Sequence, residues 1–212
     1  MRMETRITHF PSRRERKKEN TKLRIINVSM KLFEEQGFEA TSMEQIAEQV
    51  DIAKGTLYNY FPVKEAIICE FIQEFISSHT DGVKQIIHDF PDTRSRLIAF
   101  FKASLRLALE HRDIVLVYFS YSMQRILHAL TDNSERSGTE KMIAQILLAG
   151  QRSGEIRKDI GVEKMADSIY VIYAFTAISL LLKSKTTSHN SYIFKMVDLF
   201  LNGANVDKGR RK

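Results

Sequence analysis

Two very short helical segments, placed between Gly37 and Pro62, constrain this chain more than any other feature. In the first of them, apolar residues recur at helical spacing, namely Met43, Ile46, Ala47 and Val50. Asp51-Ile52 then forms a tight break. A second helix is predicted over 53–61, because the residue before Pro62 resists the helical conformation. A short helix, a tight turn and a second short helix give the helix-turn-helix layout, in which the first helix braces the second.

The boundaries before this pair are also predicted by the sequence. A helix over 21–36 ends at Gly37, which suits the positive-φ position after a helix, and Phe38 can fold back on its last turn. In Thr41-Ser42-Met43-Glu44, we expect Thr41 to be the N-cap residue and Glu44 to take position N3 of a capping box.

The second short helix reads Ala53-Lys54-Gly55-Thr56-Leu57-Tyr58-Asn59-Tyr60-Phe61. Leu57 and Phe61, four residues apart, are expected to face the core. The remaining side chains are left for DNA, because the second helix of such a motif lies in the major groove. Gly55 is a poor helix former, so its presence predicts a close approach of the backbone to DNA.

The residues from Phe38 to Ala47 and from Ala53 to Phe61, followed by Lys64-Glu65, resemble the DNA-binding domain of the TetR family of repressors. The similarity covers about residues 20–68 without a gap. It departs from the family at Pro62-Val63, where members often carry a small polar residue. The resemblance implies an all-α fold, with an N-terminal three-helix helix-turn-helix domain followed by a helical effector-binding and dimerisation domain.

Roles for single residues follow from this resemblance. Thr41, Ser42 and Lys64 would bind phosphates, and Lys54, Gly55 and Thr56 would face base edges. Tyr58 and Tyr60 would contact phosphates or thymine methyl groups, and Asn59 would pair with adenine. Thr41 is expected to serve as a cap whether or not DNA is present, so its structural and functional roles would coexist. Structural alternatives stay open for Tyr58 and Tyr60, as half-buried packing residues, and for Lys64, as an ordinary lysine at a helix end.

The net charge of +6 is concentrated at the N-terminus. Residues 1–24 contain nine Lys and Arg against three acids, and the rest of the chain is neutral. We therefore define a basic arm over 1–19, a DNA-binding domain over 20–66, a helical domain over 67–205 and a polar basic tail over 206–212. The arm suits a polyanionic partner, and a solvated charged tail is the alternative.

Long helices are predicted for the rest of the chain, where Gly and Pro are scarce. The segments are 64–88, 93–110, an apolar stretch at 114–130, then 139–153, 162–184 and 190–203, with a polar segment at 131–138. The segment 150–157 resembles the part of many TetR members that precedes two dimerising helices.

Two further sets of residues in the helical domain have expected roles. The residues expected to line an effector pocket are Phe101, Leu105, Tyr118, Tyr121, Met123 and Tyr173, with plain helical core as the alternative. Those expected at the interface between two copies are Ile169, Ile172, Thr176, Leu180, Tyr192, Met196 and Phe200.

The expected partners are double-stranded operator DNA, a second copy of the chain and a small, largely apolar effector. No enzymatic activity, metal or cofactor is expected, because no nucleophile motif, phosphate loop or His/Cys cluster is present. Cys69 is expected to be inert packing rather than a redox sensor. A cytoplasmic protein without a membrane partner is expected, because the most apolar segment, 169–182, is judged too short to span a bilayer. A helical protein that binds other proteins and a DNA-binding activator remain the alternatives.

Overall fold

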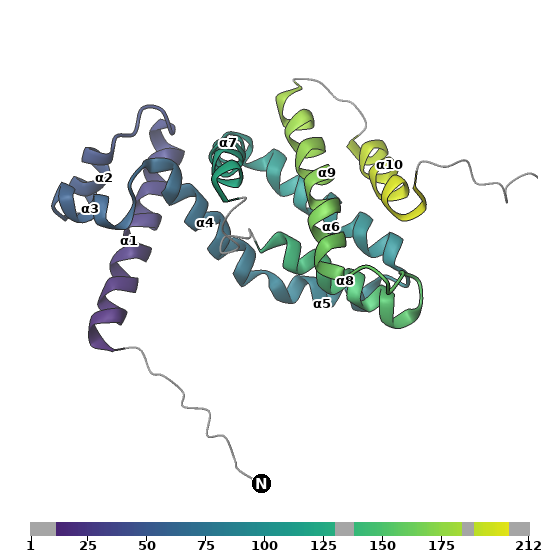
Figure 1. The fold of residues 1–212 in the computed structure, drawn as a ribbon. Helices are drawn as coiled ribbons and strands as arrows, with labels where there is room; N and C mark the ends of the chain where they lie inside the picture. The colour runs from purple at the N-terminus through teal and green to yellow at the C-terminus, as the bar shows by residue number, and fades with distance from the viewer. Residues whose placement is uncertain (1–11, 130–137, 184–188, 204–212) are drawn as a thin grey trace, which may run out of the picture. The chain divides into compact units, whose positions relative to one another are not determined.

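The structure is a computed structural model that describes residues 12–129, 138–183 and 189–203. Within these ranges every regular element is an α-helix, as the sequence predicts (Figure 1). The helices are α1 (Arg13–Gln36), α2 (Met43–Val50), α3 (Lys54–Tyr60), α4 (Lys64–Ser78), α5 (Thr80–Asp89), α6 (Thr93–Glu110), α7 (Arg112–Ala129), α8 (Thr139–Ser153), α9 (Val162–Leu182) and α10 (His189–Asn202). The predicted polar segment at 131–138 and the tail at 206–212 fall largely outside the described residues.

The chain divides into two compact units, residues 1–71 and 72–212, which we call unit 1 and unit 2. The division falls inside α4, a few residues after the boundary predicted at residue 66. Unit 1 holds α1, α2, α3 and the first part of α4, and unit 2 holds the remaining helices. Cys69 is buried in α4, as the packing interpretation expects.

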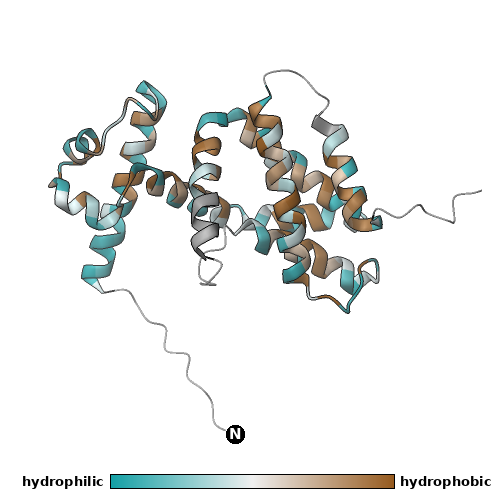
Figure 2. Cartoon of the chain, turned by 45° about the horizontal axis from the view of Figure 1, so that its top comes forward, coloured by the Kyte–Doolittle hydropathy of each residue, from teal (hydrophilic) through white to brown (hydrophobic). Residues whose placement is uncertain are grey.

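The first helix begins earlier than predicted. Ser12 caps it, because its hydroxyl accepts a hydrogen bond from the Glu15 backbone N–H and the Glu15 carboxylate accepts one from the Ser12 N–H. Residues 13–19, which were assigned to a basic arm, are therefore the hydrophilic first turns of α1 (Figure 2). Five exposed cations lie on these turns: Arg13, Arg14, Arg16, Lys17 and Lys18.

The helix predicted over 64–88 is two helices, because it breaks at His79. The Ser78 hydroxyl donates to the Phe75 carbonyl, and the His79 imidazole Nδ1 lies 2.7 Å from the same oxygen. Side chains that bind nearby backbone groups in this way compete with helical hydrogen bonds. The apolar periodicity continues across the break, which is why the sequence pattern did not reveal it.

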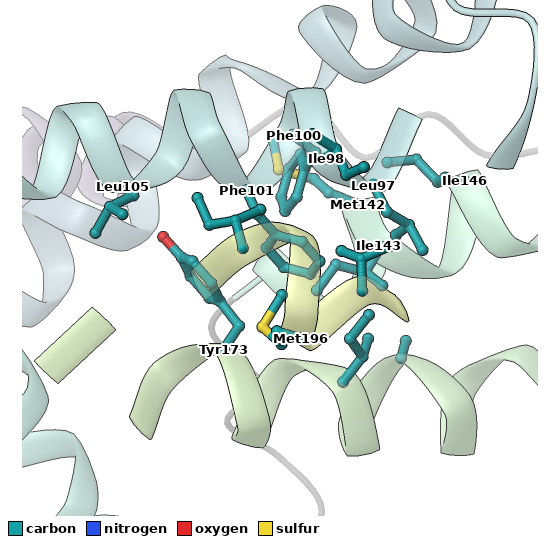
Figure 3. Packing of buried hydrophobic residues seen from close by; sticks show 14 of the residues in the cluster. Leu97, Ile98, Phe100, Phe101, Leu105, Met142, Ile143, Ile146, Tyr173 and Met196 are labelled. Atoms are coloured by element: carbon teal, nitrogen blue, oxygen red, sulfur yellow. The ribbon is translucent and has the colours of Figure 1, made fainter. Parts of the chain in front are cut away.

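The core of unit 2 is built mainly from α6, α8, α9 and α10 (Figure 3). Phe101 of α6 and Tyr173 of α9 stack with their ring centroids 4.6 Å apart. Gly150 of α8 allows close packing, because a Cβ there would overlap the Thr93 hydroxyl and lie 2.7 Å from Ile156. The contacts of Phe101 with Tyr173 and of Gly150 with Thr93 each join two helices that are far apart in the sequence.

By length and composition alone, α9 could cross a membrane. The prediction that the apolar segment is too short is therefore wrong, because the helix starts at Val162 and runs for 21 residues. Hydrophobic residues recur along its whole length (Figure 2). Seven of them are buried against other helices of unit 2, and a core helix passes the same test of length and composition.

Candidate nucleic-acid interface

The N-terminus of α2 is capped one residue later than predicted. The Ser42 hydroxyl accepts from the Gln45 backbone N–H at 3.2 Å, and the Gln45 side-chain oxygen accepts from the Ser42 N–H at 2.9 Å. This is a complete capping box. The assignment of Thr41 as N-cap and Glu44 as its partner is wrong, because the Thr41 side chain is used elsewhere.

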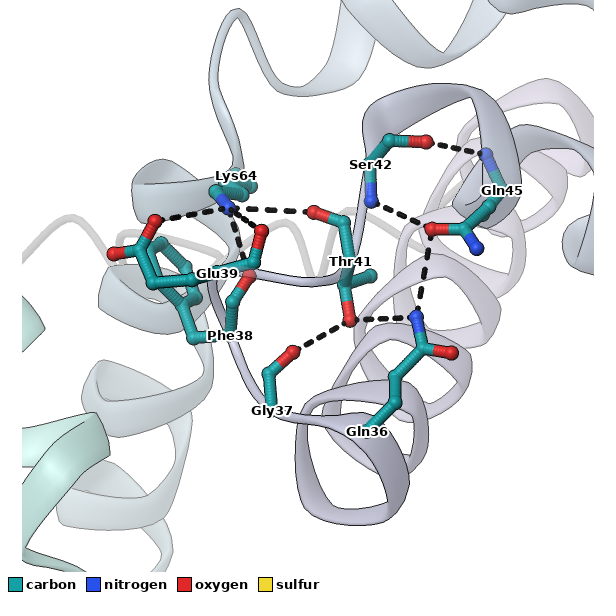
Figure 4. A network of polar contacts seen from close by, with 8 residues as sticks. All are labelled: Gln36, Gly37, Phe38, Glu39, Thr41, Ser42, Gln45 and Lys64. Atoms are coloured by element: carbon teal, nitrogen blue, oxygen red, sulfur yellow. Dashed lines mark hydrogen bonds and ion pairs between the residues drawn. The ribbon is translucent and has the colours of Figure 1, made fainter.

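Thr41 is buried, with 1% of its surface exposed. Its hydroxyl donates to the Gly37 carbonyl at 2.9 Å and accepts from the Gln36 amide at 3.0 Å (Figure 4). These bonds tie the end of α1 to the start of α2. A contact of the buried Thr41 side chain with a phosphate does not fit these bonds, and the hydroxyl does not cap α2 either.

Lys64 is likewise turned toward the protein. Its ammonium group donates to the carbonyl of Phe38 at 2.7 Å and to that of Thr41 at 3.3 Å (Figure 4). It also lies 4.2 Å from the centroid of the Phe38 ring, close enough for a cation–π contact. Lys64 thus stabilises the loop before α2 in the protein without DNA, and its contact with a phosphate stays a prediction.

The turn between α2 and α3 is as tight as predicted. Asp51 takes the left-handed conformation, with φ 56° and ψ 54°, and the Ile52 N–H donates to the Ala47 carbonyl at 3.0 Å. Arg24 of α1 donates to the carbonyl of Val50, a contact that the sequence analysis missed because it joins distant residues. The turn therefore fixes the direction in which α3 leaves α2.

The inner face of α3 is the predicted one, since Leu57 and Phe61 are both buried. The outer face carries Lys54, Gly55, Thr56, Tyr58 and Asn59, all exposed, with Tyr60 half-buried beside them. Tyr58 is 41% exposed, so packing does not account for it. Ser42, at the N-cap of α2, is half-buried. Unit 1 thus presents a hydroxyl, an amide, an ammonium and a phenol on the exposed side of one short helix.

Gly55 has no structural reason to be a glycine. Its φ is not positive, and no heavy atom lies within 4 Å of the place where a Cβ would stand. A glycine inside a helix costs about 0.5–1 kcal/mol relative to alanine. No neighbouring atom requires a glycine at this open position. A glycine here suits a surface whose backbone a binding partner approaches closely.

One exposed ion pair joins α2 and α3 beside the outer face of α3. The Glu44 carboxylate of α2 pairs with the Lys54 ammonium at the start of α3. The hydrogen bond from Lys54 lowers the pKa of Glu44, and the same bond raises the pKa of Lys54. Lys54 also lies 5.8 Å from the centroid of the Tyr58 ring.

A braced, capped pair of short helices with donors on the exposed side of the second defines a helix-turn-helix DNA-binding protein. Residues 25–70 match the family model for bacterial regulatory proteins of the tetR family. The chain is 27% identical over 145 residues to the HTH-type transcriptional repressor KstR2 of Mycolicibacterium smegmatis, a match that covers 66% of this chain and 69% of that protein. Residues 25–70 thus form a DNA-binding domain of the tetR family of bacterial regulatory proteins.

Solved structures show the same fold. Thermus thermophilus FadR, a TetR-family repressor in complex with lauroyl-CoA, aligns with a TM-score of 0.74 at 21% identity, covering 90% of this chain and 98% of that one. Bacillus subtilis FadR in complex with stearoyl-CoA aligns with a TM-score of 0.61 at 19% identity, covering 86% and 99%.

The residues predicted to line an effector pocket pack as core. Phe101, Leu105, Tyr118 and Tyr173 are all buried, and burial raises the pKa of the Tyr173 phenol. Tyr121 is half-buried, and the Met123 side chain lies outside the described residues. Unit 2 has a hollow of about 350 Å³ at the start of α6, which is lined by Asp92, Thr93, Glu155 and their neighbours. None of the residues predicted to line an effector pocket contributes to it. For these buried residues the structure favours the alternative of helical core.

The predicted interface between copies needs a correction. Ile169, Leu180 and Met196 belong to the buried core of the single chain, so these three are not available to a partner. Phe200 packs partly against this core and is half-buried. Thr176 is half-buried and its hydroxyl donates to the Ile172 carbonyl. Ile172 and Tyr192 are exposed and keep their predicted role.

Proposed function

We propose that this protein is a dimeric repressor that binds operator DNA through the outer face of α3 and leaves the DNA when a small, largely apolar molecule binds unit 2. The observation that carries the DNA-binding part is the exposed set of donors on α3, with Leu57 and Phe61 anchoring that helix in the core. KstR2 of M. smegmatis is named a repressor, which supports repression over activation. Such a protein acts in the cytoplasm, where its DNA lies.

The test of DNA binding begins with duplexes selected on the protein from a random pool. Tyr58→Ala and Asn59→Ala remove exposed side chains from α3, so we expect both to lose about 1–3 kcal/mol of binding, or about five- to 150-fold in affinity, without unfolding. Gln49→Ala, on the exposed side of α2, is the matched control and should bind as the parent does. Selection of no preferred duplex would favour the alternative, a helical protein that binds other proteins.

Repression is tested separately from binding. A reporter gene downstream of the selected duplex should be expressed less when the protein is present. Higher expression would identify an activator instead, with the same contacts to DNA.

The proposed surface for the second copy is an apolar stripe on α9. Val171, Phe175, Ile178 and Leu182 recur at helical spacing, and Phe175 is 68% exposed although it lies in the middle of the helix. Exposed Tyr192, Phe194 and Leu199 add apolar surface on α10. Exposed apolar residues at helical spacing suit an interface, and pairing of two such helices from each copy gives a four-helix bundle.

Dimerisation is tested by Phe175→Arg, which places a charge in the proposed apolar interface. We expect monomers in sedimentation and weaker DNA binding, since each monomer offers one recognition helix. Leu107→Arg, which changes an exposed apolar residue of α6 in the same way, should remain dimeric. Dimers formed by Phe175→Arg would place the interface elsewhere.

For the effector, the apolar interior of unit 2 supports an apolar ligand that enters between its helices. T. thermophilus FadR binds lauroyl-CoA, which suggests a first probe. We expect lauroyl-CoA or lauric acid to raise the melting temperature and to release the selected duplex. Release by polar polyanions alone would contradict an apolar effector.

A further inference from the structure

Glu44 is an unexpected residue on a surface that would meet DNA. It is exposed near the start of α2, its carboxylate pairs with Lys54, and both side chains remain more than half exposed, at 56% and 55%. The DNA backbone carries a dense negative charge, so a carboxylate beside the recognition helix opposes binding to any sequence.

Helix capping does not explain Glu44. The capping box of α2 is complete with Ser42 and Gln45, so the helix does not need Glu44 as a cap partner. The exposed ion pair contributes little to folding, since both side chains stay largely in water, where the attraction is screened. What remains to be explained is why Glu44 pairs with the Lys54 ammonium on this surface.

An ammonium that is already paired behaves differently from a free one on DNA. A free lysine neutralises a phosphate and releases counterions at any sequence. A paired lysine must first break its ion pair with the carboxylate. A contact with a single phosphate then only exchanges one anionic partner of the ammonium for another. Guanine offers two acceptors, O6 and N7, on one base edge in the major groove, and this contact depends on the sequence.

We propose that Glu44 is a specificity-determining residue: it holds the Lys54 ammonium on the face of α3 and suppresses its contact with phosphates, so that Lys54 strengthens binding only where a base edge offers acceptors. Glu44 is a positioning residue that acts through Lys54. This inference rests on the proposed binding of DNA by α3.

The experiment compares Glu44→Gln with Glu48→Gln, using the selected duplex and a scrambled duplex. Glu48 is also exposed on α2, so its substitution removes the same charge from the same helix without changing the partner of Lys54. For Glu44→Gln we expect affinity for the scrambled duplex to rise about two- to fivefold. The slope of log affinity against log salt on that duplex should steepen by about 0.9, the value for one added phosphate contact. Preference for the selected duplex should fall accordingly.

A double-mutant cycle tests whether the effect passes through Lys54. In a Lys54→Met background, Glu44→Gln should change neither the scrambled-duplex affinity nor the salt slope by more than Glu48→Gln does. The proposal is overturned if Glu44→Gln and Glu48→Gln behave alike in the parent, or if the effect of Glu44→Gln persists without Lys54. Thermal unfolding of each variant checks that the fold is kept. If the parent selects no duplex at all, the proposed function itself fails, which is a different outcome.

Discussion

Unit 1 and unit 2 use the same residue types in opposite ways. Gly55 in α3 faces open space, whereas Gly150 in α8 is required because a Cβ there would overlap Thr93. Tyr58 stands exposed on α3, whereas Tyr173 is buried and stacked on Phe101. Residues that packing explains are poor evidence of a binding site, and residues that packing leaves unexplained are good evidence. By this criterion the outer face of α3 is a binding surface, and the aromatic residues of unit 2 are first of all a core.

The largest expected effect is on Phe101. Phe101→Ala should lower the free energy of unfolding by about 3–5 kcal/mol, because it leaves a cavity beside Tyr173 that cannot fully collapse. Tyr58→Ala should change it by less than about 0.5 kcal/mol, because that side chain is exposed. Urea unfolding measures both. A loss below about 1 kcal/mol for Phe101→Ala would show that Phe101 lines a ligand cavity instead.

The next largest effect is expected for Gly150→Ala. We expect a loss of about 1–3 kcal/mol in unfolding free energy, because the added methyl group forces Thr93 and Ile156 to move. Gly82→Ala, in α5, meets no atom within 4 Å and should gain up to about 1 kcal/mol. Equal stability of the two variants would mean that α8 and α6 are not in close contact.

A smaller effect, which depends on pH, is expected at Glu155. Its carboxylate accepts from the Ser153 hydroxyl and from the Thr93 backbone N–H, each at 2.6 Å, and these bonds lower the pKa of Glu155 below its usual 4.5. A carboxyl whose pKa is lower in the folded protein stabilises the fold above its unfolded pKa, and this stability is lost as the pH falls through the folded pKa.

Glu155→Gln should therefore lower the melting temperature of unit 2 at pH 7 and have less effect at pH 3. Thermal unfolding at the two values measures the difference. An equal loss at both values would mean that the charge of Glu155 does not matter.

Sequence patterns predicted some boundaries well and others poorly, for physical reasons. The bounds of α6 and α8 were correct, because Asp92 caps the start of α6 and glycines with positive φ, Gly138 and Gly154, flank α8. The cap of α2 was misplaced by one residue, since Thr41 and Ser42 both carry hydroxyls and only the fold shows which one points toward the helix. The bonds of Lys64 to the backbone carbonyls at 38 and 41 were missed, because no side-chain pattern reveals them.

The dimer face was the hardest part to predict. Because α9 is apolar on most of its sides, the sequence does not distinguish its inner face from its outer one. Ile169 and Phe175 look equivalent in the sequence, yet the first is buried and the second is exposed. Ile169 and Leu180, both on α9, were assigned to the interface for this reason, although both are buried in the single chain.

The most direct test of the binding surface is the affinity of Gly55→Ala for the selected duplex, measured by fluorescence anisotropy beside Gly82→Ala. Both substitutions replace an unhindered helical glycine, so both variants should fold at least as stably as the parent. If the backbone of α3 approaches DNA closely at Gly55, Gly55→Ala should lose about tenfold or more in affinity, or about 1.4 kcal/mol, while Gly82→Ala binds as the parent does. Unchanged affinity in a folded Gly55→Ala protein would contradict the assignment of this face of α3 to DNA.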